Sequence, residues 1–218
     1  MTRPFPPVLF AAILAALAPS GARAVSGYAE CAALAETDPE RARNEARAWY
    51  EATGALGALH CEAMALTEQG ATRLAAEKLA ALANAPELTA AESAPVRIQA
   101  SRLFRAEGDM AAALAALEPA LSAGEAAAPA YVERATIRSF SDDWRGVRED
   151  LDSALRLKPG DAATLALRAA TNRRLGDAAR ARADAEAAIA ADPKEALGWF
   201  ELGFAAKGDG DETEARRA

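Results

Sequence analysis

The chain has 218 residues, a formal net charge of -7 and a single histidine, His60. The acidic balance argues against general binding of nucleic acid or anionic membranes, so no nucleic-acid partner is expected. One histidine excludes catalytic or metal sites built from several imidazoles, and the abundance of alanine favours helices throughout.

Residues 1–24 have the three parts of a secretory signal peptide. Arg3 gives a positive start, Val8 to Ala18 form an apolar run, and Ala22 to Ala24 form a small-x-small cleavage site. The run is shorter than the roughly 20 residues that cross a bilayer. We expect cleavage after Ala24 and a periplasmic or secreted protein without stable membrane insertion. The alternative is an uncleaved signal that anchors the chain to a membrane.

Two cysteines, Cys31 and Cys61, follow the apolar run. An even number of cysteines in an exported chain predicts one disulfide between them. The alternative is two buried thiols that pack as small hydrophobic side chains.

The remaining sequence repeats at a fixed spacing. The distance from Pro159 to Pro193 equals the distance from the Gly176-Asp177 pair to Gly210-Asp211. In frames that begin at residues 94, 128, 162 and 196, turn residues recur at position 15, small residues at position 8 and alanines at position 27. The members are Gly108, Asp142, Gly176 and Gly210 at position 15, Ser101, Ala135, Ala169 and Gly203 at position 8, and Ala120, Ala154 and Ala188 at position 27.

This helix-turn-helix pattern resembles the tetratricopeptide repeat (TPR) family, whose unit is about 34 residues long. Trp199, Leu202 and Gly203 are similar to the W-x-x-L-G signature of that family. The resemblance implies an all-α, right-handed superhelical solenoid of antiparallel helix pairs over residues 25–218. In the first repeat, Asp38-Pro39 stands in place of the Gly-Asp turn. Ala90 to Ser93 are interpreted as an insertion between the second and third repeats. The expected repeats, the last one truncated, are 25–55, 56–89, 94–127, 128–161, 162–195 and 196–218.

Charged residues at two frame positions vary together. Position 7 is Arg134 in one repeat and Arg168 in the next, and Asp150 and Asp184 follow at position 23, on the facing helix. A third repeat has alanine at both positions. We therefore predict an ion pair within each of the two repeats; the alternative is two unrelated solvated charges. A partly exposed pair contributes only about 0–1 kcal/mol.

No pattern in the sequence indicates an enzyme. His60 is interpreted as structural or solvated, the cysteines form no C-x-x-C pair, and no phosphate-binding glycine loop occurs. We expect no catalytic residues, no cofactor and no metal.

The resemblance implies that the first helix of each pair lines a concave groove. Positions 5, 9, 12 and 13 of those helices would then face a protein or peptide partner, and they include five basic and three aromatic side chains. Such a face favours an acidic and apolar segment; the alternative is ordinary surface charge and aromatics exposed by a truncated last repeat. The candidates are Ile98, Arg102, Arg105, Val132, Thr136, Phe140, Arg173, Arg174, Phe200, Phe204 and Lys207.

The leading hypothesis is a non-catalytic protein-protein interaction scaffold in the bacterial cell envelope. Two alternatives remain open: an accessory or regulatory part of a longer enzyme or enzyme complex, and a self-assembling structural protein. The sequence leaves the oligomeric state open.

Overall fold

The computed structural model describes residue 25 and residues 27–208. The expected signal peptide and the turn at Gly210-Asp211 lie outside this range. The described residues form α-helices and two short 3-10 helices. In chain order they are α1 (Tyr28–Thr37), α2 (Pro39–Thr53), α3 (Leu56–Glu68), α4 (Thr72–Leu82), α5 (Ala90–Ala106), α6 (Met110–Leu117), η1 (Glu118–Ser122), η2 (Gly124–Ala127), α7 (Ala128–Ser139), α8 (Trp144–Leu157), α9 (Ala162–Arg174), α10 (Ala178–Ala191) and α11 (Ala196–Gly208).

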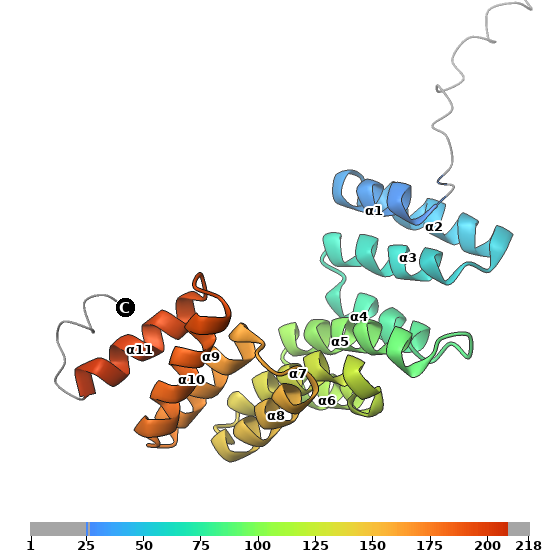
Figure 1. Ribbon diagram of the computed structural model, residues 1–218. Coiled ribbons are helices and arrows are strands. Elements are labelled where there is room, and N and C mark those ends of the chain that lie inside the picture. The colour runs from blue at the N-terminus through green and yellow to red at the C-terminus, as the bar shows by residue number, and fades with distance from the viewer. Residues whose placement is uncertain (1–24, 26, 209–218) are drawn as a thin grey trace, which may run out of the picture.

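Successive helices pair through short turns and stack side by side into an all-α solenoid (Figure 1). We call the first helix of each pair the A helix (α1, α3, α5, α7, α9 and α11) and the second the B helix (α2, α4, α6, α8 and α10). The stack curves into an open arch, with α1 at one end and α11 at the other. Each helix therefore packs mainly on its neighbours, and no single central core forms among the described helices.

The repeated Gly-Asp pair ends one helix and starts the next. Gly176 has a φ of 79°, the left-handed conformation that closes α9 and that glycine adopts at little cost. The side chain of Asp177 then accepts a hydrogen bond from the backbone N–H of Arg180 and caps α10. Asp142, at the same position as Gly176, has a φ of 58° although it is not glycine. The Gly-Asp period is therefore the period of the turn.

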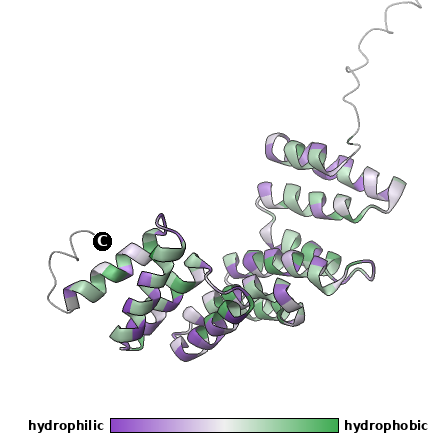
Figure 2. Ribbon diagram, viewed as in Figure 1, coloured by the Kyte–Doolittle hydropathy of each residue, from purple (hydrophilic) through white to green (hydrophobic). Residues whose placement is uncertain are grey.

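Small side chains allow the helices to pack closely. Ala135 and Ala169 at position 8, and Ala154 and Ala188 at position 27, are all buried. Alanine at a contact lets helix axes approach to the lower end of the usual range of about 8–10 Å. Figure 2 shows apolar segments alternating with polar ones around the helices of every repeat. The alanine-rich composition is thus a packing requirement of this stack.

The segment interpreted as an insertion is helical. Ala90 to Ser93, the four residues between the two expected repeats, form the first turn of α5. Thr89 and Glu92 make reciprocal hydrogen bonds between side chain and backbone, and this capping box moves the start of α5 one turn upstream. The extra residues therefore lengthen an A helix.

The third repeat departs from the pattern in its B helix. α6 ends at Leu117, and the two 3-10 helices η1 and η2 follow where α8 and α10 continue as regular helices. Glu125, which lies in η2, occupies the position of Pro159 and Pro193. This segment packs on α5 and closes the third repeat.

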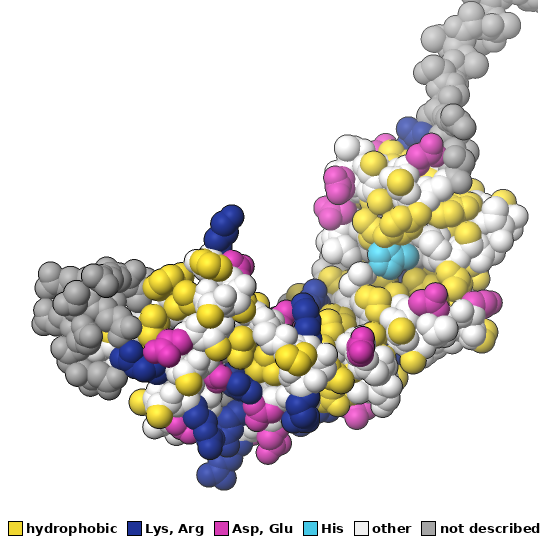
Figure 3. Space-filling view, in the orientation of Figure 1, with side chains coloured by type: hydrophobic (Ala, Val, Ile, Leu, Met, Phe, Trp, Pro, Cys, Tyr) yellow, Lys and Arg dark blue, Asp and Glu magenta, His cyan; other side chains and the backbone are white. Residues whose placement is uncertain are grey.

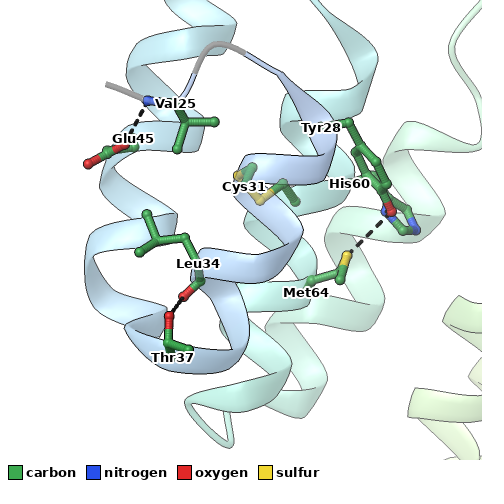
Figure 4. Close-up of a disulfide and its surroundings, with 9 residues drawn as sticks. Val25, Tyr28, Cys31, Leu34, Thr37, Glu45, His60 and Met64 are labelled. Carbon is green, nitrogen blue, oxygen red and sulfur yellow. Dashed lines mark hydrogen bonds between the residues drawn. A yellow bond between two sulfur atoms is a disulfide. The ribbon is translucent and has the colours of Figure 1, made fainter. Parts of the chain in front are cut away.

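A disulfide joins the first two A helices. Cys31 of α1 and Cys61 of α3 are bonded, with their Cα atoms 6.0 Å apart (Figure 4). Both are fully buried beside Ala46, and Val25 and Trp49 pack on this cluster. The bond therefore ties repeat 1 to repeat 2 through their A helices.

Among the described residues, no helix combines the length and the apolar composition that a membrane crossing needs.

Candidate binding face

The predicted ion pairs within repeats are present. Arg134 Nη2 lies 2.6 Å from Asp150 Oδ1, and Arg168 Nη2 lies 2.6 Å from Asp184 Oδ1. Both aspartates are buried, so these pairs are less exposed to solvent than the partly exposed pairs that the sequence indicated. Hydrogen bonding to these carboxylates raises the pKa of each arginine. The pairs tie each A helix to its own B helix.

A third pair joins the same two positions with its charges reversed, so the recurrence of arginine and aspartate does not reveal it. Glu62 of α3 stands at position 7 of its repeat, and Lys78 of α4 stands at position 23. Lys78 Nζ lies 2.8 Å from Glu62 Oε2, and Arg47 Nε of the preceding repeat lies 2.7 Å from Glu62 Oε1. Burial alone would raise the pKa of Glu62, but hydrogen bonds from Lys78 and Arg47 outweigh it and lower the pKa.

Three of the five basic residues predicted to face a partner are engaged within the solenoid. Arg102 Nε and Arg105 Nε lie 3.1 and 2.8 Å from the two carboxylate oxygens of Glu133, in the next A helix. Arg173 Nε lies 2.6 Å from Glu201, again in the next A helix. Both glutamates are buried. The expected field of five free cations is therefore much weaker than the sequence indicated.

The other two basic residues are exposed. The guanidinium of Arg174 lies over the ring of Trp144, with its carbon 4.4 Å from the ring centroid. Neither Arg174 nor Lys207 has an ion-pair partner among the described carboxylates. Within the described part of the chain, these two residues are the cations of the predicted set that remain free for a partner.

The apolar residues of the predicted set divide into exposed and buried members. Phe140, Phe200 and Phe204 are 62%, 54% and 45% exposed, and the last two rings meet edge to face at 4.8 Å between centroids. Ile98, in contrast, is only 6% exposed, so its assignment to the groove is wrong. The 3-10 segment that follows α6 packs on α5 and encloses Ile98 in the core.

A slot opens between the A helices of repeats 4 and 5. It has a volume of about 190 Å³. Val132 and Thr136 of α7 form one wall, Leu167 and Arg174 of α9 form the other, and Leu151 of α8 lies among the lining residues. The predicted residues Val132, Thr136 and Arg174 therefore come together here.

A second slot of about 270 Å³ opens between the A helices of repeats 2 and 3. Met64 and Thr67 of α3 and Leu103 of α5 line it, with Leu79 of α4. Arg102 also lines this slot, and Glu36 extends it onto α1. Of the residues predicted to face a partner, only Arg102 lines this slot, because the predicted face begins in the repeat that starts at residue 94.

The two slots are lined by equivalent positions of the repeat at two different junctions. In each, the lining comes from positions 8, 9 and 12 of one A helix, positions 6, 9 and 10 of the next, and position 24 of the intervening B helix. The equivalent residues are Ala63, Met64, Thr67, Gln99, Arg102, Leu103 and Leu79 in the first slot, and Ala135, Thr136, Ser139, Leu167, Ala170, Thr171 and Leu151 in the second.

The junctions on either side of each slot are bridged by side chains. At the junction of repeats 3 and 4, positions 12 and 6 are Arg105 and Glu133, and at the junction of repeats 5 and 6 they are Arg173 and Glu201. At the junction of repeats 1 and 2, position 6 is Cys61 of the disulfide. These ionic and disulfide bridges thus occupy alternate junctions along the row of A helices, and the junction of repeats 2 and 3 is crossed instead by the hydrogen bond between His60 and Gln99.

The single histidine links three A helices at the α1 end of the arch. His60 Nδ1 lies 2.8 Å from the hydroxyl of Tyr28 in α1, and His60 Nε2 lies 2.7 Å from Gln99 Oε1 in α5. Its ring lies between apolar surfaces in Figure 3, and Figure 4 shows it beside Tyr28 and Met64. His60 therefore bridges neighbouring helices, in keeping with a structural role.

The described residues hold no group of three or more His, Cys, Asp or Glu side chains that could bind a metal ion.

Several solved structures have the same arrangement of helices. A TPR protein from Parabacteroides merdae is 16% identical, with 86% of this chain and 74% of that chain covered and a TM-score of 0.58. MamA from Desulfovibrio magneticus is 15% identical, with 80% and 99% covered and a TM-score of 0.59. This chain has the TPR fold. YrrB, described as a TPR protein with an unusual peptide-binding site, is 15% identical, with 79% and 89% covered and a TM-score of 0.58.

No protein-family model and no curated protein sequence matches the chain. The TPR assignment therefore rests on the repeat period and on the helix arrangement, and it concerns the fold.

Proposed function

We propose that this TPR chain is a non-catalytic scaffold that binds an extended segment of a partner protein along its row of A helices. The observation that carries the proposal is the pair of open slots at equivalent junctions, two repeats apart. Each slot is lined mainly by apolar surface and can accept one side chain of an extended segment. Phe140 at the end of α7, and Phe200 and Phe204 of α11, add further exposed apolar surface.

Two further points support the proposal. The peptide-binding site named for YrrB occurs in a protein of the same fold. The charged, apolar and small-residue order of residues 1–24 favours export, so we place the scaffold in the bacterial cell envelope.

A self-assembling role is the second candidate, and one observation favours it. Phe200 and Phe204 form an exposed aromatic pair on α11, the last helix described. A second copy that stacks on this end would cover part of their surface. Light scattering that gives a monomer mass over a wide concentration range would exclude this candidate.

A peptide-binding experiment tests the proposed function. Random dodecamer peptides are selected by display on the purified chain, and a selected peptide is titrated by fluorescence anisotropy. Ala170→Trp fills the slot between repeats 4 and 5, whereas Ala163→Trp places the same side chain on an exposed position of α9 outside the slot. We expect at least tenfold weaker binding for the first variant and less than a twofold change for the second.

Two results would contradict the proposed function. One is that no peptide is selected above background. The other is that every selected peptide binds Ala170→Trp as tightly as it binds the parent, while circular dichroism shows the same helix content.

A further inference from the structure

The two open slots differ in the charge at their rims. Glu36 of α1 and Glu68 of α3 line the slot between repeats 2 and 3. Both are exposed, and neither forms an ion pair with another described residue. The slot between repeats 4 and 5 has no acidic residue in its described lining and has Arg174 at its rim.

We propose that the two slots prefer partner residues of opposite charge, so that the partner segment carries basic residues in one part and acidic residues in another. An apolar side chain flanked by Lys or Arg enters the slot between repeats 2 and 3. A second apolar side chain flanked by Asp or Glu enters the slot between repeats 4 and 5. This inference rests on the proposed function and narrows the class of partner.

The residues between the slots are consistent with this difference in charge. Glu133 carries one negative charge and neutralises only one of its two arginine partners, so the cluster of Arg102, Arg105 and Glu133 keeps a net positive charge. Arg102 does line the first slot, but its Nε is directed to Glu133. On the face shown in Figure 3, basic side chains gather over the C-terminal half, and few lie over the N-terminal half. The contrast in charge between the two slots is therefore local to their rims, with Glu36 and Glu68 at the first and Arg174 at the second.

The lengths involved suit one short segment. Packed helices lie about 8–10 Å apart, so junctions two repeats apart lie about 20 Å apart along the stack. An extended dodecamer spans about 40 Å at roughly 3.3 Å per residue. One peptide can thus reach both slots, and two anchors on one chain bind more tightly than either alone. The charges at the slot rims then determine which peptide sequence binds more tightly and in which direction the peptide runs along the A helices.

The test compares matched peptides on matched variants. A dodecamer selected on the parent is made again with its basic residues changed to Glu, and both peptides are titrated by fluorescence anisotropy. Glu36→Lys with Glu68→Lys reverses the rim of the first slot. Glu51→Lys with Glu87→Lys makes the same change in net charge at exposed positions outside both slots. Circular dichroism checks that each variant is helical.

The parent and the control should both prefer the basic peptide by tenfold or more, and the rim-reversed variant should prefer the Glu-substituted peptide. Arg174→Glu provides an independent measurement, because it should weaken binding of peptides with an acidic residue beside the second anchor at least fivefold. The inference is overturned, and the proposed function kept, if peptides compete for the slots but show no charge preference that these variants change. Both are overturned if no peptide binds at the slots.

Discussion

The residue at position 6 of each A helix distinguishes junctions closed by an ion pair or a disulfide from those at which a slot opens. Position 6 is a disulfide cysteine or a buried glutamate where the junction is bridged, as in Cys61, Glu133 and Glu201. It is Gln99 or Leu167 where a slot opens. A buried glutamate needs an arginine from the preceding helix, because an unpaired buried charge is costly. The arginine fills the space that stays open as a slot at the other junctions.

Glu62 offers a test of the buried charges at the residue scale. Its folded-state pKa is lowered, so its contribution to stability is complete above its unfolded pKa of about 4.3 and is lost as the pH falls through the folded value. Because Arg47 and Lys78 are partly exposed, we expect Glu62→Gln to lower the free energy of unfolding at pH 7 by about 1–2 kcal/mol. The difference from the parent should shrink below pH 4.

Urea unfolding of the parent and of Glu62→Gln, followed by circular dichroism between pH 3 and pH 7, measures this difference. Glu87→Gln, at an exposed site, serves as the matched control and should change little at any pH. An equal loss for Glu62→Gln at pH 3 and pH 7 would show that the Glu62 charge is not the stabilising group.

Some of the buried charged pairs could be predicted from the sequence, and others could not. The Arg134–Asp150 pair follows from covariation at positions 7 and 23 within a repeat. The Arg173–Glu201 pair joins two successive A helices, so a comparison confined to single repeats does not reveal it. Glu133 and Glu201 share position 6, and that recurrence is the signal that could have indicated the bridges.

At the scale of elements, the turns within repeats 3 and 5 are each specified by two adjacent residues, Gly108-Asp109 and Gly176-Asp177. Glycine in the left-handed conformation closes one helix, and aspartate caps the next, so the period is visible directly in the sequence. The 3-10 segment after α6 was not predictable in the same way. It replaces part of a B helix without any change in repeat length, and burial of Ile98 depends on its tertiary packing.

The disulfide stabilises one pair of elements in particular. Closing a loop of about 30 residues should contribute roughly 3–4 kcal/mol in the chain-entropy model. Because stability in a repeat array is mostly local, Cys31→Ser with Cys61→Ser should destabilise α1 to α3 much more than α9 and α10.

Hydrogen exchange read by mass spectrometry tests this localisation. Amides of α1 and α2 should lose protection in the double variant, while amides of α10 exchange at the parent rate. The absence of any change in α1 and α2, or two free thiols per parent chain titrated in denaturant without reductant, would contradict the role given to the bond.

At the scale of the whole molecule, the arch places the two slots along one row of A helices, the surface that we propose binds a partner. Bridged junctions hold successive A helices together, and the open junctions between them leave two slots along the same row of helices. The curvature of the stack follows from repeated helix packing, which is why the fold could be predicted from the repeat period and the resemblance to TPR proteins. The slots could not, because they depend on which side chains cross each junction.

A crystal structure of the chain with a display-selected peptide tests the central claim most directly. The account predicts an extended peptide along the A helices, with one apolar side chain between α3 and α5 and another between α7 and α9. It also predicts that the Arg105–Glu133 and Arg173–Glu201 bridges stay closed beneath the peptide. A peptide bound across the B helices, or one whose side chains enter the bridged junctions and leave both slots unfilled, would contradict the account.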